Sequence, residues 1–236
     1  MADIDFAYEN AMMKTNDWVF SYETEMELFK NFKLPVRSTV LKLNNGDGVM
    51  ISPINFTEAE WAEIQSNLKV KHIIAPCDLH HLYVKSAKKH ARDAKLWATH
   101  DLARKRNDVN WDQELLPQKW TLTDEIEIIP IGGSSTHEVA FFHKKAKTLV
   151  VTDLLFNLHN RKGVLSWIVM HMFGTWNRPA ISRWFKTTIK NKNQFRMSVE
   201  KILALDFETI VMAHGDIITE NAKSVFSNAL RERQLI

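Results

Sequence analysis

The spacing of apolar and polar residues divides the chain into a short leader and a longer region in which strand and helix patterns alternate. In residues 1–34, apolar side chains recur among acids and lysines, which predicts an amphipathic helical leader packed on the rest of the chain. From Ser38, two apolar, β-branched runs flank the turn formers NNGD at 44–47, where Asn and Gly tolerate the positive φ of hairpin turns. The second region, residues 35–236, is therefore expected to begin with a β-hairpin.

Strand and helix patterns alternate after this hairpin. Thr57 and Glu60 have the spacing of a capping box and predict a helix to about Asn67, after which an apolar strand ends at Pro76. Later patterns predict strands at 94–99, 125–131, 138–143, 148–153 and 208–215, and helices at 85–90, across much of 157–204 and from about 222. A strand, helix, strand order is typical of an α/β fold.

Composition narrows the classes of protein that fit. The 236 residues carry a net charge of +3, which is too small to indicate nucleic-acid binding, so no nucleic-acid partner is expected. Cys77 is the only cysteine, which excludes an internal disulfide and suits a reducing compartment, and we interpret it as a small, partly buried residue. Acids interrupt the apolar N-terminus and no apolar run is long enough to span a membrane, which predicts a cytoplasmic protein.

Side chains with metal or proton chemistry follow three of the predicted strands. Asp78, His80 and His81 follow the first of these strands, Asp153 the second and His214 the third. Because ligands of α/β proteins gather beyond the carboxyl ends of strands, we expect these groups to form one site. Imidazole nitrogen and carboxylate oxygen suit Zn²⁺, and they suit Fe or Mn as well. The same residues could instead have structural roles in the turns where they lie.

The sequence also resembles the metallo-β-lactamase-fold hydrolase superfamily. The stretch IIAPCDLHHL is similar to that family's strand followed by His-x-His-x-Asp-His, although the motif is degenerate here. In register, Pro76 and Asp78 stand at the first two His positions, His80 at the Asp position and His81 at the final His position. Only the last of the three histidines of the motif is therefore kept.

Two later stretches are more similar to the family. KTLVVTDLLF resembles the strand that delivers a bridging aspartate, which falls on Asp153, and IVMAHGDII resembles the last motif, whose histidine falls on His214. In IEIIPIGGSSTHEVAFF, the histidine of the family's Gly-His-Thr falls on Ser134, and His137 lies three residues away. The resemblance covers residues 36–236 and is closest to an uncharacterised branch with a His-His pair and an LLFNL segment.

The resemblance implies an α/β fold of the four-layer αββα type, with a helical cap inserted at 157–204. It also implies that half of a two-metal centre is missing, because one ligand set is reduced to Pro76, Asp78 and Ser134 unless His137 joins the site. We therefore predict a single divalent metal, Zn with Fe or Mn as alternatives. The predicted metal ligands are His80, His81, Asp153 and His214.

The function that the resemblance implies is hydrolysis by a metal-activated water. The substrate would be an ester, lactone, amide or phosphoester, with Asp78 as general base and His80 either as a ligand or as a proton shuttle. A closed tetrahedral site formed by all four ligands would instead be structural. The alternative function is a non-catalytic metal-binding or ligand-binding protein that kept the fold but lost half of the dinuclear centre.

The segment between Asp153 and Glu200 contains no acidic residue. Its basic residues are Arg161, Lys162, Arg178, Arg183, Lys186, Lys190, Lys192 and Arg196. They could form a solvated helix pair packed on the core, a cap that attracts an anionic substrate, or a membrane-surface helix. We expect a small-molecule substrate, anionic if these residues face the site, and no contact with a membrane surface.

Overall fold

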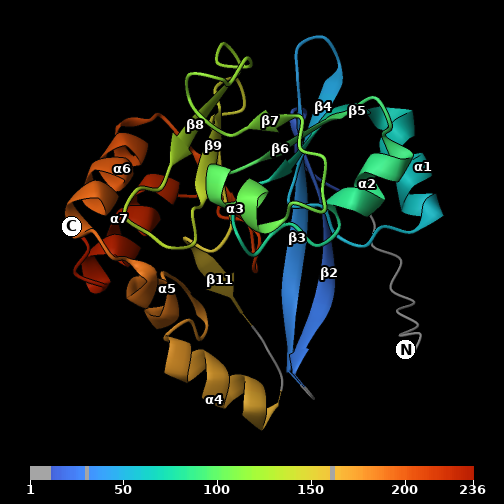
Figure 1. Ribbon diagram of the computed structural model, residues 1–236. Helices are drawn as coiled ribbons and strands as arrows, with labels where there is room; N and C mark the ends of the chain where they lie inside the picture. Colours follow the sequence, from blue (N-terminus) through green and yellow to red (C-terminus); the bar gives the residue numbers. More distant parts are fainter. Residues whose placement is uncertain (1–11, 30–31, 160–162) are drawn as a thin grey trace.

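Two β-sheets packed face to face form the centre of the structure (Figure 1). The computed structural model describes residues 12–29, 32–159 and 163–236. The first sheet has the strand order β1-β2-β3-β4-β5-β6-β7, and the second has the order β13-β10-β9-β8. Strands β11 and β12 form a separate antiparallel pair.

The strands of the first sheet are β1 (Met13–Asn16), β2 (Val19–Phe29), β3 (Phe32–Lys42), β4 (Asp47–Ile51), β5 (Lys69–Ala75), β6 (Lys95–Ala98) and β7 (Gln113–Glu114). The remaining strands are β8 (Ile126–Pro130), β9 (Val139–His143), β10 (Thr148–Val151), β11 (Phe156–Leu158), β12 (Arg178–Ala180) and β13 (Thr209–Met212). Antiparallel pairing joins β1 to β4 and β8 to β10, whereas β4 to β7 and the pair β10–β13 are parallel.

Helices cover the outer faces of both sheets (Figure 1). On the first sheet these are α1 (Glu58–Asn67), α2 (Val84–His90) and α3 (His100–Lys105). On the second they are α5 (Arg183–Thr188), α6 (Lys192–Ala204) and α7 (Ala222–Glu232). Helix α4 (Val164–Phe173) lies apart from these layers, near the far end of the long β2–β3 hairpin (Figure 1).

Alternating side chains along the strands separate the apolar cores. On β5, Ile73 packs under the helices of the first sheet, whereas its neighbour Ile74 packs between the sheets. On β10, Val150 packs between the sheets, whereas Leu149 packs under the helices of the second sheet. This period of two is the expected result of strand geometry, and both faces of each sheet are buried. The predicted four-layer αββα sandwich is confirmed.

Several local predictions are also confirmed. The turn at 44–47 joins β3 to β4 as an antiparallel hairpin, and Gly46 adopts a φ of 87° there. Thr57 caps α1, and its side chain and that of Glu60 form the reciprocal hydrogen bonds of a capping box. Helix α3, which Thr99 caps, is not among the helices that the sequence pattern predicts.

The helical leader predicted for residues 1–34 is wrong over the part that the structure describes. Residues 13–16 and 19–29 form β1 and β2, residues 32–34 begin β3, and β2 pairs with β3 along nearly its whole length. The apolar residues Phe20, Tyr22 and Met26 are spaced at multiples of two and pack on one face of the sheet. That period is typical of a strand, and it outweighs the interspersed acids. Residues 1–11 of the leader lie outside the described residues.

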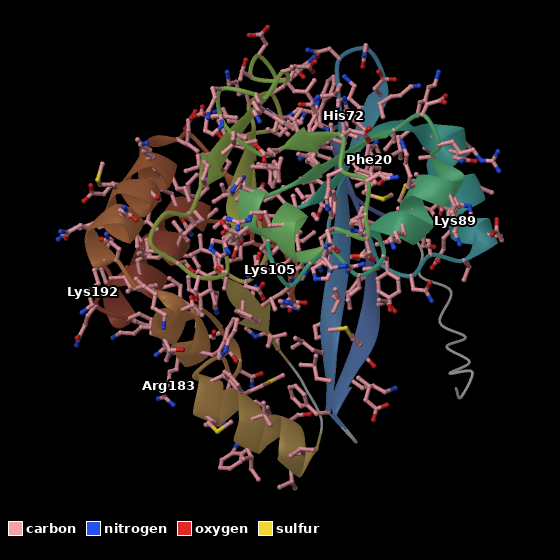
Figure 2. The ribbon with its side chains drawn as sticks, viewed as in Figure 1. Phe20, His72, Lys89, Lys105, Arg183 and Lys192 are labelled. Atoms are coloured by element: carbon pink, nitrogen blue, oxygen red, sulfur yellow. The ribbon has the colours of Figure 1, made fainter. Side chains whose placement is uncertain are left out.

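Among its described residues, the predicted insertion at 157–204 contains three helices and two short strands. Helix α6 buries Phe195, Val199 and Ile202 in the same core as the second sheet, so this helix belongs to the outer layer of the sandwich. Helices α4 and α5 contact each other beside it. Arg183 and Lys192, at the starts of α5 and α6, project from this side of the molecule (Figure 2). Arg161 and Lys162 lie outside the described residues.

None of the described helices is both long enough and apolar enough to cross a membrane. The cytoplasmic location stays a prediction.

Arg37 joins the two sheets at the point where β13 ends. Its guanidinium is buried and donates hydrogen bonds to the carbonyl oxygens of Met212 and Gly215 at 2.7 and 2.6 Å, and to the Glu23 carboxylate. The Arg37 backbone N–H donates to the carbonyl oxygen of Ala213 at 2.8 Å. A buried charge is stable only when such partners replace its hydration. The segment that follows β13 is thereby held against β3.

We expect Arg37→Met to lower the free energy of unfolding by about 3 kcal/mol, because two buried carbonyl oxygens and the Glu23 carboxylate lose this donor. The matched control is Arg196→Met, since Arg196 makes an exposed ion pair with Glu200 and its removal should cost less than about 1 kcal/mol. Urea denaturation measures both. Equal, small losses in the two variants would contradict a structural role for this joint.

Candidate metal centre

The loops after β5, β10 and β13 bring His80, Asp153 and His214 together. Each side chain comes from a different strand, two from the second sheet and one from the first. All three residues are buried, with no more than 8% of the surface of any one exposed. Three of the four predicted ligands therefore lie in one cluster.

The Asp153 carboxylate lies between the two imidazole rings. His80 Nε2 is 3.4 Å from Oδ2, and His214 Nε2 is 3.4 Å from Oδ1. Hydrogen bonds between a charged nitrogen and a carboxylate are shorter, at about 2.7–2.9 Å. Two ligands of a tetrahedral Zn²⁺ with bonds of about 2.0–2.1 Å are instead separated by about 3.3–3.4 Å. The spacing therefore suits ligands that share a cation better than direct hydrogen bonds.

Neighbouring groups orient both rings. The Nδ1 of His214 donates to the carbonyl oxygen of Pro35 at 2.7 Å, and the ring stacks on Phe156 with its centroid 5.0 Å away. Because a carbonyl oxygen accepts but cannot donate, a neutral His214 presents the lone pair of Nε2 to the carboxylate. Two facing lone pairs need a proton or a metal ion between them. Ser52 Oγ, 2.7 Å from Nδ1, orients the His80 ring, and this hydroxyl can either donate to the ring nitrogen or accept from it.

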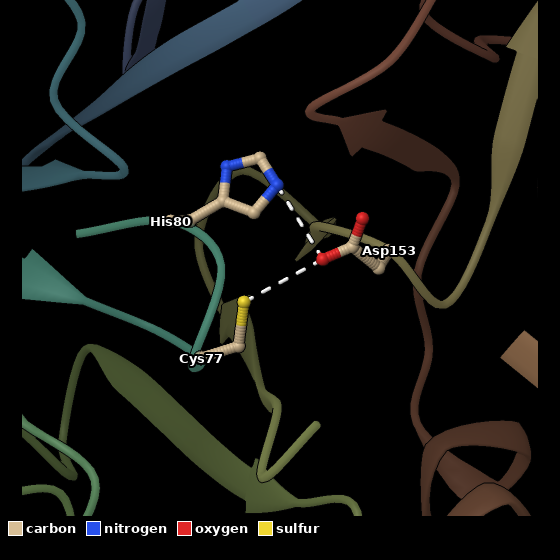
Figure 3. A group of neighbouring side chains, drawn as sticks. All are labelled: Cys77, His80 and Asp153. Carbon is tan, nitrogen blue, oxygen red and sulfur yellow. Dashed lines mark hydrogen bonds and ion pairs between the residues drawn. The ribbon is translucent and has the colours of Figure 1, made fainter. Parts of the chain in front are cut away.

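Cys77 joins His80 and Asp153 in a group whose ligand atoms all lie within 4.8 Å of one another (Figure 3). Its Sγ is 3.5 Å from Asp153 Oδ2, and it accepts hydrogen bonds from the N–H of Leu79 and the hydroxyl of Thr152. The sulfur and His80 thus approach the same carboxylate oxygen, whereas His214 approaches the other one. Cysteine, histidine and aspartate are all ligands of zinc, so this buried trio could hold one metal ion.

The charge of Asp153 dominates the electrostatics of the cluster. Burial alone would raise the pKa of Asp153, but the charges and hydrogen bonds of His80 and His214 lower it below the ordinary value. Burial disfavours a charged His80, but the carboxylate next to it raises the pKa of this ring. Burial, together with the charge of Asp153, raises the pKa of the Cys77 thiol. A cation at this site would oppose that last shift, because it favours the thiolate.

Glu138 does not belong to the cluster, but its carboxylate holds the backbone on which Asp153 stands. The buried carboxylate accepts hydrogen bonds from the backbone N–H groups of Thr152 and Asp153, at 2.6 and 3.1 Å. Burial and the charge of Asp153 raise the pKa of Glu138 to about 7. These two hydrogen bonds fix the backbone at the end of β10 and thereby the direction of the Asp153 side chain.

Asp78 lies in a different group of side chains. Its carboxylate bonds Lys105 and lies 3.0 Å from Nδ1 of His137, whose Nε2 is 3.5 Å from Asp101. The part of the chain that the structure describes does not place Asp78 among the residues that line the cavity above the cluster. The predicted general base therefore forms an ion-pair group with His137, and the structure does not bring either residue to Asp153.

The fourth predicted ligand, His81, lines that cavity but turns Nδ1 towards Arg106, 2.6 Å away. Burial and the charge of Arg106 lower the pKa of His81. Ser134, at the position of the family's missing histidine, bonds the hydroxyl groups of Thr136 and Thr188 at 2.9 Å. Of the described residues, Cys77 rather than His81 completes the group around Asp153 Oδ2. The sequence interpretation of Cys77 as a small, partly buried residue missed its place beside Asp153.

A cavity of about 780 Å³ opens above the cluster. Asp153, His80 and His214 line one part of it, and β2, β3 and α4 contribute apolar walls. Substrate and cofactor sites commonly have volumes of about 300–1,000 Å³ with few polar groups at defined positions. The buried cluster is therefore accessible to a small molecule through this cavity.

A family model described as a domain of unknown function, DUF4336, matches residues 16–168, which is more than half of the chain. The matched region includes Cys77, His80 and Asp153 but ends before His214. Among curated proteins, a sequence comparison finds no match.

Many solved structures have a similar fold, and several of them are metallo-β-lactamases. The enzyme from Pontibacter korlensis superposes with a TM-score of 0.67 at 14% identity, over 96% of this chain and 99% of that one. The mono-zinc form of FIM-1 from Pseudomonas aeruginosa gives a TM-score of 0.64 at 8% identity, over 94% and 95%. The enzyme from Hirschia baltica gives 0.64 at 12% identity, over 95% and 97%. At such low identity these matches establish the fold alone.

The structure and the sequence pattern make different predictions about the metal ligands. We expect Cys77→Ala to weaken zinc binding roughly 10- to 100-fold or more, because it removes a buried ligand, whereas His81→Ala should leave the affinity unchanged. Competition with a chromophoric chelator measures the affinity, and circular dichroism checks that both variants fold. Loss of zinc from His81→Ala, with full retention by Cys77→Ala, would restore the ligand set predicted from the sequence.

Proposed function

Because the chain belongs to the DUF4336 family and has the metallo-β-lactamase fold, we propose that it is a metal-dependent hydrolase. Its substrate class would be an ester, lactone, amide or phosphoester, and the metal would be Zn, with Fe or Mn as alternatives. One observation carries the proposal. A buried carboxylate, with two imidazole nitrogens each 3.4 Å away and a thiol at 3.5 Å, lies at a cavity large enough for a substrate.

The residues of the cluster suit this role. A divalent metal, when bound, lowers the pKa of water to about 7 and so supplies a nucleophile at neutral pH. Asp153, His80 and Cys77 would hold the metal, and His214 would either join them or contact the ligand that occupies the remaining position. Ser52 and Pro35 fix the two rings, which reduces the rearrangement needed on binding.

Proton transfer requires a residue that lines the cavity, because only such a residue can reach a bound substrate. His80 and His214 both do so, and both carry a ring nitrogen directed at the carboxylate. Asp78 is a weaker candidate than the sequence pattern indicates, because Lys105 and His137 engage its carboxylate. Because His80 would hold the metal, we assign proton transfer to His214, with Asp78 positioning the loop that carries His80.

A specific observation also favours the alternative, a metal-binding or ligand-binding protein without catalysis. The residues at the positions of the missing ligand set are engaged elsewhere, Asp78 with Lys105 and Ser134 with two threonine hydroxyl groups. A second metal would therefore lack its ligands in this arrangement. The two functions differ in whether one metal, bound as described, leaves a position for water.

We expect metal-loaded protein to hydrolyse at least one class in a panel of generic esters, lactones, amides and phosphodiesters. Asp153→Asn should lower the rate at least about 100-fold, because it removes the charge that holds the metal. Arg196→Ala, on the outer surface of α6, is the matched control and should retain full activity. Elemental analysis of the protein purified without added metal establishes which metal is present. Stoichiometric metal without turnover on any class would support the binding protein instead.

A further inference from the structure

The cavity above the candidate metal centre has an unusual distribution of apolar side chains at its mouth. Leu28, Leu79, Leu82 and Trp184 all line the cavity, yet between 38% and 57% of the surface of each is exposed. They come from β2, from the loop after β5 and from α5, which are far apart in the sequence. Exposed apolar groups that gather around an opening mark a binding site for an apolar ligand.

The interior of the cavity continues this apolar surface. Its deeper walls include Leu34 and Val36 from β3, Val169 and Met170 from α4, and Phe156 from β11. The polar groups of the candidate metal centre occupy one part of the lining, so the cavity combines a long apolar wall with a localised polar region. A ligand that fits both parts has an apolar chain attached to a polar group.

Charge restricts the polar group further. Among the described residues that line the cavity, Glu25, Glu27, Glu60 and Asp153 are acidic and none is Lys or Arg. The exposed basic residues of α5 and α6, such as Arg183 and Lys192, are not part of this lining. An anionic head group would therefore meet like charges in the cavity, and an uncharged one would not.

We propose that the cavity binds an amphiphile with one unbranched apolar chain of about eight carbons or more and an uncharged polar head. The chain lies along β3 and α4, and the head lies next to Asp153 and His80. The position of the head rests on the proposed function, under which it carries the hydrolysable bond. The binding of the chain does not depend on catalysis.

Helix α4 indicates where such a ligand could come from. Its inner side lines the cavity with Val169, Met170 and Phe173. Its outer side carries four exposed apolar residues, which are Val164, Trp167, Ile168 and Met172. A helix that is apolar on both sides is normally buried, so the outer side suits contact with a lipid surface. The ligand is therefore either a free amphiphile or a lipid taken from a bilayer.

The test uses 1-O-octylglycerol, an uncharged ether without a hydrolysable bond, and its short analogue 1-O-butylglycerol. Titration calorimetry on the metal-loaded protein should show that the octyl ether binds at least about 30-fold more tightly, since each buried methylene group contributes roughly three- to fourfold. Octanoate is compared on metal-free protein, because its carboxylate would bind a metal at the head position, and there it should bind more weakly than the octyl ether. Equal affinities of the two ethers, or a preference for octanoate, would overturn the proposal.

Two variants locate the binding site. Leu34→Trp should fill the cavity and Leu82→Asp should place a charge at its mouth, and each is expected to abolish the difference between the octyl and butyl ethers. Leu82 is 57% exposed, so its variant should fold even if the other does not. The control is Met197→Trp, an exposed site on α6 outside the cavity. Unchanged octyl binding in Leu82→Asp would overturn the assignment of the chain to this cavity.

Two further measurements distinguish a bilayer lipid from a free amphiphile, and a bound amphiphile from a second copy of the chain at the cavity mouth. Sedimentation with phosphatidylcholine vesicles, lost in Trp167→Glu, would support a bilayer lipid, whereas octyl binding without sedimentation would support a free amphiphile. Light scattering tests whether a second copy of the chain covers the cavity mouth. A dimer that excludes the octyl ether would overturn the proposal. Octyl binding without any hydrolysis of the ester panel would support the cavity proposal and contradict the hydrolase.

Discussion

The contact between β3 and the end of β13 is the constraint on which the candidate site depends. Arg37 donates to two carbonyl oxygens of the β13 segment, and Pro35, two residues away, accepts the hydrogen bond from His214. One strand of the first sheet therefore orients a histidine that the second sheet delivers. A buried guanidinium is costly, but here each hydrogen bond also fixes the distance between the sheets. His214 can face Asp153 only while this joint holds.

Much of the site could be predicted because it follows from strand ends. Asp153 and His214 each come directly after a short apolar run, and parallel strands β10 and β13 place the two residues at the same edge. The choice between Cys77 and His81 could not be made in the same way. It depends on the path of the loop after β5, where the N–H of Leu79 turns back to the Cys77 sulfur and Arg106 engages His81. Those contacts are tertiary, so no local pattern contains them.

The fold was predictable to a similar extent, and the error at the N-terminus has a physical cause. A strand whose outer face is polar and a helix with an apolar stripe both alternate apolar and polar residues, and acids among them resemble a solvated helix. Phe20, Tyr22 and Met26 are separated by even numbers, which is the distinguishing signal. The pairing of β2 with β3 decides between strand and helix. In the hairpin, the backbone N–H and C=O groups of β2 bond those of β3, whereas a helix would pair its backbone groups within itself.

The same β-strand that orients His214 in the candidate metal centre also forms the cavity wall, so a ligand in the cavity and a metal at that centre should not bind independently. Along β3, Leu34 and Val36 face the cavity, while the carbonyl of Pro35 and the side chain of Arg37 hold the end of β13. A chain packed against Leu34 and Val36 restricts the movement of β3, which stabilises the orientation of His214. A metal that draws His214 and Asp153 together restricts the same strand from the other side. By thermodynamic linkage, whatever free energy one ligand contributes to ordering β3 must also appear in the affinity for the other.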